Sequence, residues 1–298
     1  MKQCMATISL GGTIVEKIEA IARAGFSGIE LFDEDVRRSG LSAAEIGLRC
    51  RDAGLDIQSY QPFRRAEGVP DDEFADVVAR FRDELTIARD LGTGTIVIVS
   101  NTDADAVADR DRSAGQVAVL GAIAAEYGVG IMFEALSWGT HISRVTDAWD
   151  VLDRAGLRRQ SLVLDTFHHL ALGDGIAELA AVPIDAVGLV QVADAPLLSM
   201  DLLQWSRNHR CFPGEGDLEP QGVAGAAFQA GFDGVVSLEI FNPRYRELPP
   251  GEVARRGAES LRGLLAEFER TESAPSSGGH IGLATPSLWM GVGGVGLA

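Results

Sequence analysis

The chain has 298 residues, of which 46% are hydrophobic and 23% are charged, and its formal net charge is −17 at pH 7. This composition is typical of a globular protein with a large core, and the length fits a single α/β barrel of about 250 residues. A surface this negative repels phosphate groups, so we expect neither nucleic acid nor an anionic membrane surface as a partner.

The cysteines and the N-terminus bear on the cellular compartment. Cys4, Cys50 and Cys211 form an odd set without metal-binding spacing, which predicts no disulfide framework and a reducing environment. The N-terminal MKQCMATISL does not resemble a signal peptide, and no apolar run approaches the roughly 18–20 residues of a membrane span. We therefore expect a cytoplasmic protein that acts on a small molecule; the sequence leaves its oligomeric state open, a homo-oligomer included.

Short apolar, β-branched runs alternate along the chain with longer amphipathic segments. The runs predict eight strands, at 4–9, 27–32, 56–60, 95–100, 129–134, 161–165, 186–192 and 234–240. Apolar residues at three- and four-residue spacing predict helices at 14–24, 42–53, 71–91, 113–127, 146–155 and 251–269.

Glycines mark where several of these helices end. They precede the next strand in RAGFSGIEL, DAGLDI, DLGTGTIVI, EYGVGIMF and QAGFDGVVSL, which is typical of a left-handed helix cap. Because the strand, helix and glycine unit recurs about eight times, we predict an α/β fold, a (β/α)8 TIM barrel, over residues 1–270. An open doubly wound sheet is the alternative, but no Gly-x-Gly-x-x-Gly follows the first predicted strand.

The composition changes abruptly after residue 270. Residues 271–298 are rich in Gly, Ser and Pro, carry almost no charge and show no helical or strand period. We interpret this segment as a flexible tail, a linker to a part that is missing, or a non-native end.

Four oxygen-bearing side chains stand at or near the ends of the last four predicted strands. Glu134, Asp165, Gln191 and Glu239 follow the runs VGIMF, SLVL, VGLV and VVSL. Any one alone is explained by a salt bridge or by a hydrogen bond to a loop. Since the carboxyl ends of parallel strands meet at one face of a barrel, the four together predict a metal site. An all-oxygen set suits Mg²⁺ or Mn²⁺ rather than a structural zinc.

A histidine follows one of these acids closely. His168 stands three residues after Asp165 in SLVLDTFHHL, at a predicted strand-to-helix junction. This spacing lets a metal ligand and an imidazole share one pocket, which makes His168 the candidate general base or proton shuttle. Most lone histidines are structural, and the neighbouring His169 is the weaker candidate.

Basic residues gather in two segments that are predicted to lie at the same face. The segment QWSRNHRCFPGEGD, predicted to be a loop, holds Arg207, His209 and Arg210. The segment YQPFRR holds Tyr60 and Arg64. In so acidic a chain, such clusters can bind an anionic substrate, with arginine gripping a carboxylate through two hydrogen bonds. A solvated basic loop that pairs with nearby acids is an equally strong interpretation.

These motifs resemble a known superfamily. The strand-end Glu, D-x-F-H, strand-end Gln, S-L-E-I and PGEGD pattern is similar to the xylose-isomerase-like TIM barrels, which include sugar isomerases, epimerases, inosose dehydratases and apurinic endonucleases. Within it, the chain resembles the bacterial 3-dehydroshikimate dehydratases over roughly residues 5–265. The stretches that carry this resemblance are ATISLGGT, YQPFR, FEALSWGTH, LDTFHHL, VQVADAP, WSRNHRCFPGEGD and SLEIFN. Many sugar isomerase relatives have a histidine at the position of Gln191, followed by a lysine; Q-V-A-D favours the dehydratases.

The resemblance implies a reaction and roles for the residues. It implies loss of water from 3-dehydroshikimate to give protocatechuate, with Mg²⁺, Mn²⁺ or Co²⁺ acting as a Lewis acid. His168 is then the base, and Arg210, with Arg207 and His209 as alternates, holds the substrate carboxylate. Some bacterial dehydratases of this type carry a C-terminal domain similar to 4-hydroxyphenylpyruvate dioxygenase, for which this chain is too short.

Three other functions compete with this interpretation. A ketose isomerase or epimerase of the same superfamily acts on a similar hydroxyketone without losing water. An endonuclease is disfavoured because the chain has five histidines and a net charge of −17. A barrel that binds a metal or a sugar acid without turnover is the third alternative, against which the pairing of His168 with Asp165 argues.

Overall fold

The computed structural model describes the backbone of residues 1–273 and the side chains of residues 1–268. Of the predicted tail, 271–298, only the first three residues belong to this part, and they continue the last helix. The tail interpretation for 274–298 therefore lies outside the described residues.

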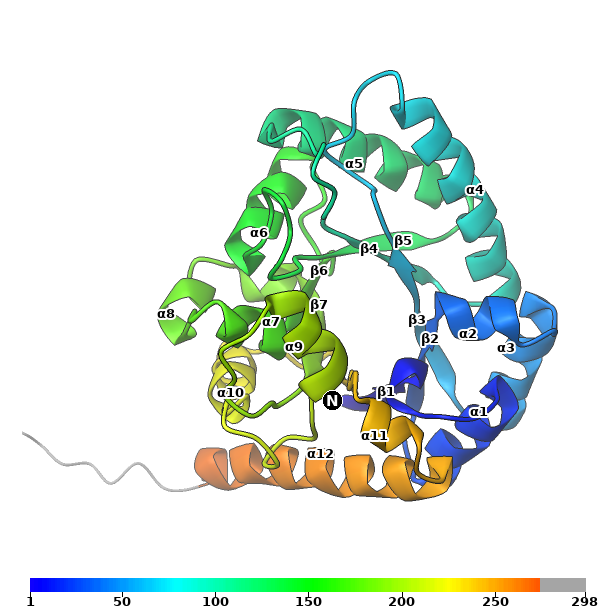
Figure 1. Ribbon diagram of the computed structural model, residues 1–298, viewed down its shortest axis with the longest axis vertical. Coiled ribbons are helices and arrows are strands. Elements are labelled where there is room, and N and C mark those ends of the chain that lie inside the picture. Colours follow the sequence, from blue (N-terminus) through cyan, green and yellow to red (C-terminus); the bar gives the residue numbers. More distant parts are fainter. Residues whose placement is uncertain (274–298) are drawn as a thin grey trace, which may run out of the picture.

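Eight parallel strands close into a barrel in chain order, and β1 pairs with both β2 and β8. This confirms the predicted (β/α)8 TIM barrel (Figure 1). The strands are β1 (Lys2–Ala6), β2 (Gly28–Phe32), β3 (Asp56–Phe63), β4 (Thr95–Val99), β5 (Gly130–Glu134), β6 (Leu162–Asp165), β7 (Val187–Val192) and β8 (Val235–Leu238).

Helices surround the strands, and the six predicted ones are present with ends that differ by at most four residues. They are α1 (Ile14–Arg23), α3 (Ala43–Asp52), α4 (Phe74–Leu91), α5 (Arg110–Glu126), α6 (Val145–Arg154) and α12 (Pro250–Ser273). The structure adds α2 (Asp33–Arg38), α7 (Thr166–Ala171), α8 (Ile176–Leu179), α9 (Leu202–His209), α10 (Gln221–Gln229), α11 (Pro243–Arg246) and the 3-10 turns η1 (Thr7–Ser9) and η2 (Ile184–Ala186). Most of these are too short to show a helical period in the sequence.

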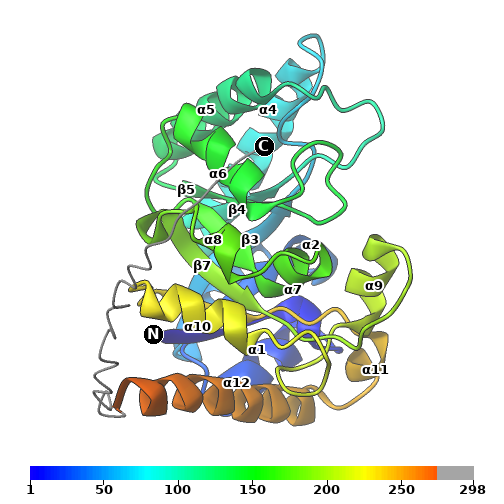
Figure 2. The ribbon, with the colours of Figure 1, turned by 90° about the vertical axis from the view of Figure 1, so that its left-hand side faces the viewer.

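The prediction of a loop between Gln204 and Asp217 was wrong in its first half. Helix α9 begins after Asp201, whose carboxylate accepts a hydrogen bond from the backbone N–H of Gln204, a standard N-cap. Figure 2 shows α9 and α11 at the same end of the barrel, away from the N-terminus. Arg207 and His209 are therefore held on a helix above the strand ends, and Arg210 directly follows it.

Local signals in the sequence account for many of the helix ends. Thr13 and Glu16 form a capping box at the start of α1, in which each side chain bonds the backbone N–H of the other. All five predicted glycine caps have positive φ; Gly92, with φ of 82°, ends α4 in the left-handed conformation. These caps fix where the chain leaves each helix and enters the next strand.

The period of two along each strand separates the two parts of the core. In β4, Ile96 and Ile98 pack in the large core shared with the helices, whereas Val97 and Val99 belong to a smaller cluster inside the barrel. The interior cluster also contains Met132, Val163 and Leu189. Two residues further along their strands, in the same inward direction, stand Glu134, Asp165 and Gln191. The barrel interior is therefore polar at the carboxyl ends of the strands and apolar in the layer that precedes them.

Within residues 1–273, no helix combines the length and the apolar character that a membrane crossing requires.

Candidate active site

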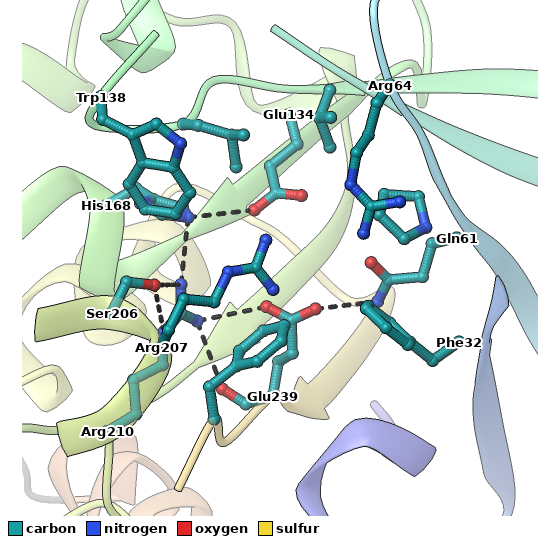
Figure 3. A pocket seen from close by; sticks show the side chains of 14 residues that line it. Phe32, Gln61, Arg64, Glu134, Trp138, His168, Ser206, Arg207, Arg210 and Glu239 are labelled. Carbon is teal, nitrogen blue, oxygen red and sulfur yellow. Dashed lines mark hydrogen bonds and ion pairs between the residues drawn. The ribbon is translucent and has the colours of Figure 1, made fainter. Parts of the chain in front are cut away.

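A pocket opens at the carboxyl ends of the strands (Figure 3). The space between its lining atoms is about 320 Å³ when the open solvent at its mouth is included. Its lining combines three aromatic rings, three arginines and two of the four predicted metal ligands. The lining residues are Phe32, Gln61, Pro62, Arg64, Val99, Glu134, Leu136, Trp138, His168, Ser206, Arg207, Arg210, Glu239 and Phe241.

The structure brings the predicted acidic residues together. Glu134 and Glu239 line the pocket, and Asp165 lies behind its wall, 2.7 Å from the Arg210 guanidinium. Donor atoms of Glu134, Asp165 and His168 all lie within 4.8 Å of one another, and all three residues are buried. Glu239 joins this cluster through Arg210, whose Nη1 lies 3.2 Å from its Oε2.

The electrostatics of these carboxylates show that negative charge is crowded here. Burial, followed by the charges of Glu239 and Asp165, raises the pKa of Glu134 well above its usual value. Burial also raises the pKa of Glu239 to about 7, against the opposing effect of Arg210. For Asp165, burial acts upward but is outweighed by Arg210 and His168, so its pKa is lowered. Two of the three carboxylates therefore lack sufficient positive charge nearby.

Gln191 adds an oxygen with no partner to this crowded cluster. The residue is fully buried, and its Nε2 donates to both carboxylate oxygens of Glu30, at 3.3 and 3.2 Å. Its Oε1 has no hydrogen-bond partner in the part of the chain that the structure describes, which is unusual for a buried amide oxygen. Gln191 pairs in register with Asp165 on the neighbouring strand. Three carboxylates and a free amide oxygen form a donor set that fits a divalent cation.

His168 is held between the wall of the pocket and Arg210. Its Nδ1 lies 3.0 Å from the hydroxyl oxygen and 3.2 Å from the backbone nitrogen of Ser137. Its Nε2 lies 3.0 Å from Nη2 of Arg210 and 3.4 Å from Oε1 of Glu134. The Ser137 N–H can only donate to Nδ1 and the Arg210 guanidinium can only donate to Nε2, so these two donors compete for the single lone pair of a neutral imidazole. Nε2 is the proton acceptor in the tautomer that carries its hydrogen on Nδ1. Burial lowers the pKa of His168 to about 3, which keeps the ring neutral.

Arg210 is committed to groups of the protein. It is 1% exposed, and Nη1 donates to Asp165 and Glu239, Nη2 to His168 and Ser206, and Nε to Ser206. With these donors engaged, Arg210 serves as a buried counter-charge for the carboxylates. The expectation that it grips a substrate stays a prediction that this geometry does not favour.

Arg207, one turn earlier on α9, has the opposite character. Its guanidinium lies 4.3 Å from the ring centroid of Phe241 and 5.8 Å from that of Trp138, and extends into the pocket (Figure 3). Among the described residues it makes no hydrogen bond or ion pair, and burial lowers its pKa. Arg64, on the far wall, donates to Asp33 and is about half exposed. Arg207 therefore has free donors that face the pocket.

Two of the predicted substrate-binding residues lie elsewhere. Tyr60 is 2% exposed, packs in the core between strands and helices, and its hydroxyl donates to Glu84 on α4. The period of two along β3 turns Tyr60 outward when Gln61 faces the pocket, so the expectation for Tyr60 is corrected. His209 is the last residue of α9 and does not line the pocket.

The sequence reasoning missed several residues of the site. Glu30 is fully buried under the pocket and contacts Gln61 and Gln191; a charged residue inside the apolar run SGIELF was a signal for it. Ser206 and Trp138 gave no such signal, because an ordinary serine on a helix and an aromatic residue in a loop have many structural roles. Their place at the pocket depends on tertiary contacts.

Comparison with known proteins places this site among relatives. A 3-dehydroshikimate dehydratase of Pseudomonas putida is 37% identical over 271 residues, which are 91% of this chain and 42% of the relative. One from Pseudomonas aeruginosa is 38% identical over 288 residues, or 97% of this chain and 44% of the relative. One from Neurospora crassa is 30% identical and covers 89% of this chain and 92% of the relative. The chain thus spans less than half of the two bacterial relatives.

Solved structures and a family model agree with the fold. A xylose isomerase-like TIM barrel/4-hydroxyphenylpyruvate dioxygenase fusion protein superposes with a TM-score of 0.87 at 36% identity, covering 93% of this chain and 45% of that one. The IOLI protein, whose structure holds a zinc atom, has a TM-score of 0.79 at 18% identity over 90% of this chain and 99% of its own, and shows the fold alone. The family model described as xylose isomerase-like TIM barrel matches residues 18–264. The chain belongs to the xylose isomerase-like TIM barrel family.

Proposed function

We propose that the chain dehydrates 3-dehydroshikimate to protocatechuate with the help of a divalent cation. The observation that carries the proposal is the union in one pocket of crowded buried carboxylates, a neutral imidazole and an arginine with free donors. The three relatives named as 3-dehydroshikimate dehydratases support the choice of substrate, above all the Neurospora crassa protein, whose length the chain nearly covers.

We assign the cation to Glu134, Asp165, Gln191 and Glu239, with Mg²⁺, Mn²⁺ or Co²⁺ as candidates. When bound, the cation supplies Lewis-acid polarisation of the substrate ketone, which acidifies the neighbouring carbon. His168 also lies within ligand distance of this cluster. We give it the proton-transfer role instead, with Nε2, which lies 3.4 Å from Oε1 of Glu134, as the proton acceptor in the tautomer that carries its hydrogen on Nδ1.

His168 moves the proton in this proposal. Its Nε2 accepts the proton from C4, between the C3 ketone and the carbon that carries the leaving hydroxyl. The C5–O bond breaks, the electrons of the C4–H bond form the C4=C5 double bond, and the departing hydroxyl takes the proton that His168 accepted and leaves as water. Loss of a C6 proton and protonation of the C3 oxygen then complete the aromatic ring. The atoms balance as one substrate to one catechol and one water.

Arg207 holds the substrate carboxylate. This group lies across the ring from C4, the carbon that loses its proton. The Arg207 guanidinium makes no hydrogen bond or ion pair with the described residues and packs against Phe241 and Trp138, so its fork is preorganised in a partly dry environment. Arg64 adds positive charge on the opposite wall. The aromatic side chains beside them reduce the access of water to the reacting carbons.

Incubation with 3-dehydroshikimate and Mn²⁺, followed by ultraviolet spectroscopy and mass spectrometry, tests the proposal. We expect a catechol whose mass is lower than that of the substrate by one water, and no product after chelation until Mn²⁺, Co²⁺ or Mg²⁺ is restored. A product of unchanged mass would instead identify an isomerase or epimerase. Full activity in protein shown to be metal-free would remove the cation from the mechanism.

A further inference from the structure

One fully buried carboxylate, that of Glu30 on β2, lies outside the proposed ligand set but contacts it from below. Three donors converge on it. The Ser59 hydroxyl donates to its Oε2 at 2.7 Å, Gln61 Nε2 donates to Oε2 at 3.2 Å, and Gln191 Nε2 donates to both oxygens. Burial raises the pKa of Glu30, and in its ionised form the carboxylate can only accept, so all three side chains donate to it.

This arrangement decides which end of two amides faces the site. Gln61 Nε2 lies between two acceptors, Glu30 at 3.2 Å and Glu239 at 3.0 Å, so its nitrogen must occupy this position. Figure 3 shows the bond to Glu239. Gln191 turns its nitrogen to Glu30 for the same reason. Its oxygen is then left on the other end of the amide, buried and without a partner.

We propose that Glu30 is a positioning residue that presents the amide oxygen of Gln191, rather than its nitrogen, to a divalent cation. The inference rests on the proposed metal site. An amide nitrogen cannot coordinate a hard cation, so a reversed Gln191 removes one ligand. Through Gln61, the same carboxylate also holds the Oε1 end of Glu239 in place. Two strand-end donors, on β7 and after β8, therefore depend on one residue of β2.

The decisive change is Glu30→Gln, which keeps the shape but gives residue 30 an amide group that can donate. Gln191 is then free to turn over, because its oxygen can accept from the new amide while its nitrogen faces the site. We expect the Kd for Mn²⁺ to rise about 10- to 100-fold, as for other groups that orient metal ligands. We also expect bound Mn²⁺ to gain about one water, which takes the place of the lost oxygen.

Two measurements on Mn²⁺ alone, without substrate, test this: titration calorimetry for the Kd and water-proton relaxation for the number of waters on the bound ion. The matched control is Ser59→Ala, which removes another partner of Glu30 but leaves its carboxylate, so the number of waters should stay at the wild-type value. The exchange variant E30Q/Q191E keeps the charge and places at residue 191 a carboxylate with oxygen at both ends. It should restore the wild-type number of waters.

The outcomes separate the two proposals. If wild-type protein binds no Mn²⁺, or if Gln191→Ala binds it as wild type does, the metal site itself is wrong and this inference fails with it. If Gln191→Ala adds a water but Glu30→Gln does not, the metal site stands and the role of Glu30 is refuted. If Glu30→Gln does not fold, E30Q/Q191E decides. An additional water on Mn²⁺ in that variant would contradict the proposal that Glu30 acts by orienting the side chain of residue 191.

Discussion

Replacing Arg207 by methionine should separate substrate binding from chemistry. Methionine keeps apolar packing against Phe241 and Trp138 but removes the charged fork. The guanidinium has no other partner among the described residues, so the loss should fall on the substrate. A hydrogen bond between charged groups contributes about 1.5–3 kcal/mol, and two such bonds in a partly exposed pocket, with Arg64 still present, give about 3 kcal/mol. That corresponds to a fall of about 100-fold in kcat/KM.

Steady-state kinetics with 3-dehydroshikimate and saturating Mn²⁺ measures this effect. We expect KM to carry most of the loss, because the carboxylate is bound equally in the ground state and in the transition state. Arg207→Lys, which keeps the charge without the fork, should recover part of it. Arg207 also faces Glu239, so the Mn²⁺ affinity of each variant is the control. An unchanged KM in Arg207→Met, with Mn²⁺ bound, would refute the clamp and return the role to Arg210.

Three further predictions concern the base, the ligands and the outward-facing tyrosine. His168→Ala should lower kcat about 10²- to 10⁴-fold while the Kd for Mn²⁺ changes only a few-fold; a large loss of Mn²⁺ affinity would make His168 a ligand instead. The pKa of Glu239 is raised to about 7, so a proton competes with the cation below that pH, and Mn²⁺ should bind about tenfold more weakly at pH 6 than at pH 8. Titration calorimetry measures the Kd for Mn²⁺ at both pH values in wild type and in Glu239→Gln, in which the pH dependence due to Glu239 should vanish. An equal dependence of the Kd on pH in the two proteins would contradict this prediction. Tyr60→Phe should leave kcat/KM unchanged and lower the free energy of unfolding by about 1 kcal/mol, through the lost bond to Glu84; a large rise in KM would place Tyr60 at the substrate after all.

The sequence predicts the barrel and the inward acids well because both depend on short-range periodicity. Once a strand is identified, its period of two sets the direction of each side chain, and Glu134 and Asp165 follow from it. The same rule, applied within YQPF, would have turned Tyr60 outward and Gln61 inward. The segment was instead treated as one cluster, which placed Tyr60 at the site together with its neighbours.

The remaining features depend on contacts between distant segments. Arg207 lies on α9 and Arg210 directly follows its last residue, and which of them faces the acids depends on how that helix sits over β6 and β8. The orientation of the Gln191 amide is set by Glu30, 161 residues away in the chain. No local pattern in the sequence encodes which arginine faces the acids or how the Gln191 amide is oriented. Both depend on contacts that exist only once the barrel has closed.

Arg210 has a consequence for how the protein and its metal meet. The chain supplies its own cation to Asp165 and Glu239, so part of the mutual repulsion of the acids is relieved before any ion arrives. Folding therefore does not have to wait for the metal, unlike in small domains that are unfolded without their zinc. Under the proposed function, the barrel therefore forms before the cation binds, and removal of the cation should leave it folded.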